Sequence, residues 1–146
     1  MKKITVIILS MAMAITMLAA CGSAADKAYV EWADQNVEKI EQASRDYTAA
    51  ATAAGSDAAA ALAAIDTYLA VLNSAKSSFD RLDYNGLNSE NKSKHDEQRQ
   101  NLETGLTEFT AARADVEAFL AAEQQQEDDG EEYYYDDDEY YDEDDE

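Results

Sequence analysis

The sequence predicts an all-α protein: an antiparallel three-helix bundle, or a coiled-coil-like helical hairpin, followed by a disordered C-terminal tail. The chain of 146 residues has no proline, only five glycines and abundant alanine, which favours continuous helices over strands and tight turns. Apolar residues recur at helical spacing in three segments, and two short glycine-containing stretches separate these segments. We therefore expect one small helical bundle over residues 26–124.

The first periodic segment begins at Asp26, whose side chain is suited to cap a helix N-terminus. Small or apolar residues then recur on one face over about 28 residues, which corresponds to about 40 Å of helix. They are Val30, Ala33, Val37, Ile40, Tyr47, Ala51 and Ala54. Gly55 follows where a left-handed cap commonly ends a helix, and Ser56 or Asp57 is placed to begin the next one.

The second segment is the most apolar of the three. Its apolar face consists of Ala58, Leu62, Ile65, Leu69, Leu72, Phe79 and Leu82, flanked by Ala61, Tyr68 and Ala75. Alanines dominate both sides of the preceding turn, over residues 49–54 and 58–64, and would let the two helix backbones approach closely. The alternative is that these alanines serve only as strong helix formers.

A second reversal is expected over residues 83–89, where an Asn-Gly pair signals a turn and Asn88 or Ser89 can cap the third helix. Residues 90–100 are almost wholly polar, so we expect this helix to begin with exposed or fraying turns. Its buried stripe is expected to consist of Leu102, Leu106, Phe109, Ala112, Val116, Phe119 and Leu120. Gly105 within this stripe marks close packing, a kink or a weak helix.

Residues 125–146 are acidic and tyrosine-rich. Residues 127–146 contain 14 carboxylates and no basic side chain, and repulsion at this density opposes a packed fold. We therefore expect a disordered tail, which is either a solvated extension or a segment that binds cationic proteins, peptides or divalent cations. The candidate binding residues are Tyr133, Tyr134, Tyr135, Asp136, Asp137, Asp138, Tyr140 and Tyr141.

The formal net charge of −21 argues against nucleic-acid binding, which needs clustered Lys and Arg. No group of residues in the sequence predicts catalysis, a cofactor or a metal site, so we expect a protein that is not an enzyme.

The single histidine, His95, is expected on a solvated helix surface. Asp66 and Arg113 are placed to meet near the helix seam or to flank it. Trp32 is expected to pack at the edge of the first seam; the alternative is a contact with a membrane interface.

The first residues are organised as an export signal. Two lysines precede an apolar run of about 17 residues, which is at the short limit for a membrane-spanning helix. The run ends in Leu18-Ala19-Ala20-Cys21, followed by Gly22. This motif resembles the lipobox of bacterial lipoproteins. The resemblance implies that residues 1–20 are a signal peptide, and that Cys21 becomes an N-terminus carrying acyl chains such as palmitate.

An ordinary cleaved signal or a single transmembrane helix would be the alternatives to this interpretation. Cys21 is the only cysteine, so no disulfide can form within one chain, and lipidation gives the thiol a role. Residues 21–25 would then form a short, flexible lipidated tether. Self-association is a separate expectation, because exposed parts of the alanine-rich helix seam could pack against a second copy of the chain.

The resemblance thus implies a lipid anchor at the extracytoplasmic face of a bacterial membrane. We expect the anchored protein to have a non-enzymatic interaction or structural role in the cell envelope. The alternative is a scavenger whose acidic tail binds cationic peptides or divalent cations at the cell surface.

Overall fold

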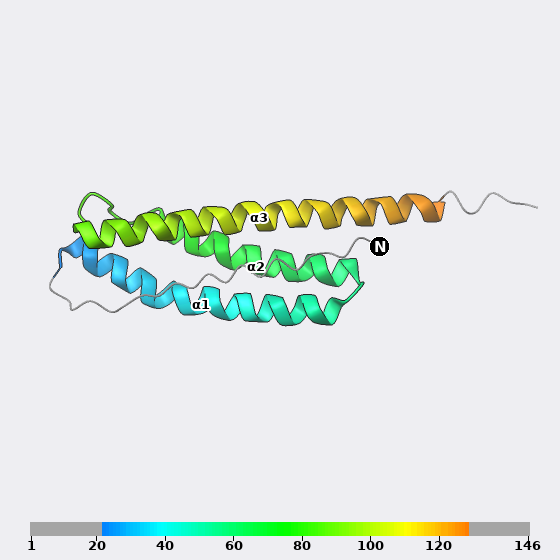
Figure 1. Ribbon diagram of the computed structural model, residues 1–146, viewed down its shortest axis with the longest axis horizontal. Helices are drawn as coiled ribbons and strands as arrows, with labels where there is room; N and C mark the ends of the chain where they lie inside the picture. Colours follow the sequence, from blue (N-terminus) through cyan, green and yellow to red (C-terminus); the bar gives the residue numbers. More distant parts are fainter. Residues whose placement is uncertain (1–21, 129–146) are drawn as a thin grey trace, which may run out of the picture.

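The computed structural model describes residues 22–128, which form three antiparallel α-helices (Figure 1). Helix α1 spans Ala24–Ala54, α2 spans Ala58–Phe79 and α3 spans Ser89–Asp128. The predicted all-α, three-helix architecture is therefore confirmed. The predicted signal peptide, Cys21 and residues 129–146 of the predicted tail lie outside the described residues.

Three helix boundaries differ from the prediction. Helix α2 ends at Phe79, so Leu82, which was expected on its apolar face, lies in the following turn. Helix α1 has Ser23 as its N-cap, and Asp26 instead completes a capping box from the third position of the helix. The chain is therefore helical from Ala24, within the stretch expected to form a flexible tether. Helix α3 continues to Asp128, beyond the predicted end of the bundle at residue 124, so the first residues of the predicted tail are helical.

The predicted turn residues act as expected at the other boundaries. Gly55 ends α1 with a φ of 57°, a backbone conformation that residues with a Cβ rarely adopt. The Asp57 side chain caps α2 by accepting a hydrogen bond from the backbone N–H of Ala60 at 2.9 Å. The Asn88 side chain accepts one from the backbone N–H of Asn91 at 2.9 Å and so caps α3.

Helix α2 lies between the other two helices (Figure 1). Its backbone packs closely against both α1 and α3, whereas α1 and α3 meet chiefly through large side chains. By length and composition α2 is apolar enough to cross a membrane, with a mean hydropathy of 1.4 in its most apolar part. Its position between two amphipathic helices accounts for this composition.

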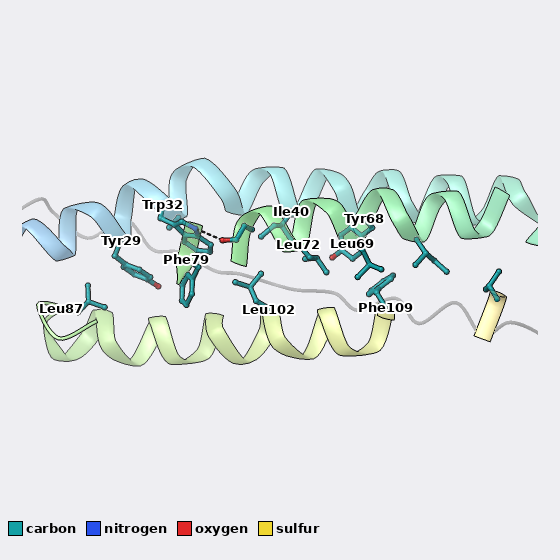
Figure 2. Packing of buried hydrophobic residues seen from close by; sticks show 14 of the residues in the cluster. Tyr29, Trp32, Ile40, Tyr68, Leu69, Leu72, Phe79, Leu87, Leu102 and Phe109 are labelled. Carbon is teal, nitrogen blue, oxygen red and sulfur yellow. Dashed lines mark hydrogen bonds between the residues drawn. The ribbon is translucent and has the colours of Figure 1, made fainter. Parts of the chain in front are cut away.

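The core is one continuous cluster that runs along the helices (Figure 2). At one end the Trp32 ring packs edge-on against Phe79, with 4.7 Å between ring centroids. Further along, the rings of Tyr47, Tyr68 and Phe109 lie 4.6–5.7 Å apart, and each ring comes from a different helix. Large aromatic side chains thus fill the space between α1 and α3.

Trp32 is a core residue and not a surface one. Its side chain is 5% exposed, and its indole N–H lies 2.9 Å from the Ser78 hydroxyl and 3.3 Å from the Ala75 carbonyl oxygen. This confirms the packing interpretation. A ring buried to this degree is not available to a membrane interface.

The alanines that flank the first turn have mixed positions. Ala58 and Ala64 are buried, whereas Ala49, Ala50, Ala53 and Ala60 are exposed. Ala58 belongs to the core cluster. The exposed alanines favour the helix without entering the core.

The C-terminal end of the predicted α3 stripe is partly wrong. Phe119 is 49% exposed, while Leu120 is only partly buried against the core. The physical reason is that α3 extends past the turn between α1 and α2, so its last turns have no helix beside them (Figure 1). Gly105 is buried, and α3 continues through it, which agrees with a close-packing role.

We predict that Phe79→Ala will lower the free energy of unfolding by about 3–5 kcal/mol, because this fully buried ring contacts both Trp32 and His95. Phe119→Ala is the matched control and should change stability by less than about 1 kcal/mol, because this ring is half exposed. Denaturant unfolding followed by circular dichroism measures both. Equal losses in the two variants would contradict the observed core.

Candidate functional site

The candidate site is the N-terminal end of the bundle, where α1 begins, α2 ends and α3 begins (Figure 1). The first described residue is Gly22, and Cys21, the predicted lipidation site, directly precedes it. Any group attached to Cys21 would therefore be linked to this end of the bundle. Two polar clusters, around Asp26 and around His95, determine how this end is built.

The carboxylate of Asp26 connects the start of α1 with the start of α3. Asp26 is 6% exposed and accepts hydrogen bonds from three N–H groups. The donors are the backbone of Ser23 at 3.0 Å, the backbone of Asn88 at 3.0 Å and the side chain of Asn91 at 2.8 Å. The carboxylate thus satisfies donors that are more than 60 positions apart in the sequence.

These hydrogen bonds keep Asp26 ionised. The N–H groups of Asn88 and Asn91 stabilise the charged form most strongly, so the pKa of Asp26 lies well below its usual range. Burial acts in the opposite direction and is outweighed. A buried carboxylate that holds its charge in this way needs all of its donors, so it fixes their relative positions.

The Ser23 hydroxyl adds a second connection at the same place. Its oxygen accepts from the backbone N–H of Asp26, and its proton can be donated to the carbonyl oxygen of Gly86 at 2.7 Å or to the Asp26 carboxylate at 3.0 Å. The shorter contact is the one to Gly86, in the connection between α2 and α3. The beginning of α1 is thereby attached to a loop 63 positions away.

Glycines allow this close approach. A Cβ at Gly86 would lie 2.8 Å from the Ala25 Cβ and 2.7 Å from an Asp83 carboxylate oxygen. A Cβ at Gly22 would lie 2.5 Å from the Asp26 Cβ. Larger residues at either position would therefore push the loop or the N-terminal residues away from α1.

The expectation of a solvated His95 is wrong. The side chain is 1% exposed, and its ring stacks on Phe79 with 4.2 Å between centroids and 23° between planes. Tyr84 and Tyr29 surround it at centroid distances of 5.0 and 6.1 Å. The imidazole is therefore part of the core at this end of the bundle.

The neighbouring polar stretch is also packed and does not form the exposed first turns that we expected. Asn91 and Gln98 are 7% and 5% exposed, and with His95 and Leu102 they form one face of α3. The positions 91, 95, 98 and 102 follow the spacing of four and three that defines a buried helical stripe. This spacing is visible in the sequence, but a search for apolar residues alone does not find it.

Burial lowers the pKa of His95, and the positive charge of Arg99 lowers it further. Asp96 acts in the opposite direction; one of its carboxylate oxygens lies 3.8 Å from His95 Nδ1. The other Asp96 oxygen accepts a hydrogen bond from the Tyr84 hydroxyl at 2.9 Å, which raises the pKa of Tyr84. Because burial and Arg99 outweigh Asp96, the pKa of His95 lies below its usual value and the imidazole is neutral near pH 7.

This arrangement supports packing better than acid–base chemistry. His95 Nδ1 has no hydrogen-bond partner among the described residues, and the ring is closed off from solvent by aromatic side chains. Burial and the charge of Glu97 raise the pKa of the nearby Tyr29 to about 12, so its phenol stays protonated. Within residues 22–128 no group of three or more His, Cys, Asp or Glu side chains is placed to hold a metal ion.

The structure brings Asp66 and Arg113 together, the pair that the sequence placed near the helix seam. Arg113 Nε donates to an Asp66 carboxylate oxygen at 2.6 Å, and Arg113 also pairs with Glu117 at 2.8 Å. These side chains are 40–48% exposed, so the pair bridges α2 and α3 at the surface and contributes little to stability.

The remaining predicted site residues lie outside the described residues. They are Cys21, Tyr133, Tyr134, Tyr135, Asp136, Asp137, Asp138, Tyr140 and Tyr141. No protein-family model, curated protein or solved structure matches the chain. The function is therefore argued from the residues and from the geometry of the bundle.

We predict that Asp26→Asn will lower the midpoint of denaturant unfolding. An amide cannot accept all three hydrogen bonds, and its own N–H₂ group would face other N–H donors. Asp34→Asn, on the exposed face of the same helix, is the matched control and should have little effect. Because the folded-state pKa of Asp26 is depressed, its contribution should be lost as the pH falls below about 4. An Asp26→Asn variant as stable as Asp34→Asn would show that this carboxylate is dispensable.

We predict a second loss of stability at milder acidity. Since burial holds the folded-state pKa of His95 below its usual 6.5, the unfolded chain binds a proton first as the pH falls. The free energy of unfolding should therefore decrease below about pH 6.5, until the folded-state pKa is reached. His95→Leu should remove this part of the pH dependence. Denaturant unfolding at about pH 7.5 and about pH 5 tests it, and an unchanged difference in the variant would refute the assignment.

Proposed function

We propose that this protein is a lipid-anchored bacterial lipoprotein at the extracytoplasmic face of the membrane, with a non-enzymatic interaction or structural role. The support from the sequence is the export signal that ends in Leu18-Ala19-Ala20-Cys21, followed by Gly22. Two acyl chains on Cys21 would give stable attachment, since each buried methylene contributes about 0.8 kcal/mol.

The observation that carries the structural part of the proposal is the position of Ser23 and Asp26. Both residues are hydrogen-bonded to the α2–α3 connection or to α3, directly after the proposed lipid attachment site. The chain between a lipid on Cys21 and the folded bundle would therefore be very short. Such an arrangement holds one end of the bundle at the membrane surface.

The bundle would then act as a spacer. Helix α3 has 40 residues, which corresponds to about 60 Å at 1.5 Å per residue. It begins at the end of the bundle where α1 begins, and its last turns extend past the opposite end (Figure 1). The residues that follow Asp128 would thus start far from the anchor, and a docking surface on the helices would stand clear of the lipid headgroups.

The same geometry favours the second candidate function, a scavenger of cationic peptides or divalent cations. The proposed binding residues, from Tyr133 to Tyr141, follow the end of α3 that is remote from Cys21. Asp128, the last described residue before this segment, would lie much farther from an anionic membrane than the Debye length of about 8 Å at physiological salt. The chain that carries the proposed binding residues would therefore leave the bundle where the field of the lipid headgroups is screened.

We predict that Cys21→Ser will abolish incorporation of radiolabelled palmitate and will release or mislocalise the protein in a bacterial cell. The reason is that the Cys21 thiol is the only one in the chain. Ala24→Ser, outside the predicted lipobox, is the matched control and should label normally. A wild-type protein that takes up no label and is wholly soluble would rule out the anchor.

A further inference from the structure

A long groove of about 1180 Å³ runs between α1 and α2. Its lining residues come from these two helices and from the N-cap of α2, and none comes from α3. The two faces of the α1–α2 hairpin thus differ. Helix α3 packs on one face, and the other carries this groove, which we call the α1–α2 groove.

The groove has the dimensions of a helix-binding site. On α1 its lining extends from Asp34 to Ala54, which corresponds to about 30 Å at 1.5 Å per residue. Alanines from both helices line its far half: Ala50, Ala53, Ala54, Ala60, Ala63 and Ala64. Because a methyl group extends so little from the backbone, another helix could approach at the short end of the usual interaxial range, about 8 Å. A long, shallow channel of this kind fits a rod better than a compact small molecule.

The charged residues of the groove are predominantly acidic. Asp34, Glu38, Asp46 and Asp57 line it, against a single cation, Lys39. Within residues 22–128 none of these five side chains takes part in an ion pair; the ion pairs of α1 and α2 lie elsewhere, for example between Arg45 and Glu41. Asp57 caps α2 and Asp46 accepts a hydrogen bond from the Gln42 side chain at 2.7 Å. The carboxylates of Asp34 and Glu38 have no such side-chain partner among the described residues and are available to a binding partner.

The negative charge of the α1–α2 groove distinguishes between the molecules that could bind there. A second copy of the chain would bring a net charge of −21 to an acidic groove, and the C-terminal residues 127–146 would bring 14 carboxylates and no base. Like charges placed opposite each other cost free energy on association, so both occupants are disfavoured. An anionic membrane surface is disfavoured for the same reason.

We propose that the α1–α2 groove binds a cationic amphipathic helix of a partner protein or peptide. Small apolar residues of the partner would pack on the alanines, and Lys or Arg residues at its borders would face Asp34, Glu38 and Asp46. These three carboxylates of α1 all line the groove, so a partner helix with bases along its border fits best. The inference rests on the proposed interaction role but does not depend on lipidation.

The test uses the full mature chain, residues 21–146, with Cys21→Ser, and a synthetic helical peptide of about 20 residues. The peptide carries Ala and Leu on one face and Lys along both borders, and calorimetry measures its Kd. Ala53→Leu with Ala63→Leu fills the groove without a change in charge and should weaken binding at least about tenfold. Ala49→Leu with Ala59→Leu, at exposed positions of the same helices outside the groove, is the matched control and should bind as the parent does.

A second pair of variants tests the charges. Asp34→Asn, Glu38→Gln and Asp46→Asn together should weaken binding and reduce its salt dependence. The control removes three carboxylates from the exposed surface of α3, with Glu97→Gln, Asp115→Asn and Glu123→Gln, so the net charge is the same in both variants. Equal weakening in the two variants would mean that only net charge matters, which overturns the proposal.

The tail is the competing site and has its own variant. A variant of the same mature chain in which Asn and Gln replace every Asp and Glu of residues 131–146 should keep the parent affinity if the groove binds the peptide. If this variant loses the peptide while the groove variants keep it, the tail is the binding site and the groove proposal is wrong. Circular dichroism confirms that each variant remains helical. Palmitate labelling, which tests the anchor, can fail without affecting any of these results.

Discussion

The structure depends on the need to cover α2. This helix is apolar around much of its circumference, and residues 22–128 supply two other helices with which to bury it. Helices α1 and α3 therefore both pack their backbones against α2, and the wider space between α1 and α3 is filled by rings such as Tyr47 and Phe109. Among the described residues no third helix packs on the other side of the α1–α2 pair, and this is where the groove lies.

The N-terminal end of the bundle is closed by polar groups more than by apolar ones. The Asp26 carboxylate accepts hydrogen bonds from the N-cap of α1, from the loop before α3 and from α3, while His95 takes the place of an aromatic core residue between Phe79 and Tyr84. The satisfied hydrogen bonds of Asp26 define relative positions more strictly than apolar contacts, because each donor and acceptor has a required direction. Asp26 and His95 both make this end sensitive to acid.

Charge and geometry combine into one functional picture. The proposed anchor lies next to the hydrogen-bonded end of the bundle, and the acidic residues after Asp128 follow the opposite end of α3 in the sequence. Between them, α1 and α2 present an alanine-lined groove bordered by carboxylates. A protein held at a membrane in this orientation would present the proposed groove to cationic partners.

The sequence alone determined the helix count, both turns and most of the core, because periodic apolar residues such as Ile65, Leu72 and Leu102 and the caps at Asp57 and Asn88 act locally. Only the tertiary structure decided the roles of Asp26 and His95. Their partners lie more than 60 positions away or on other helices, so neither propensity nor hydropathy indicates that these polar side chains are buried. The groove was likewise decided by tertiary packing, since alanine has the same helix propensity whether α3 covers it or leaves it open.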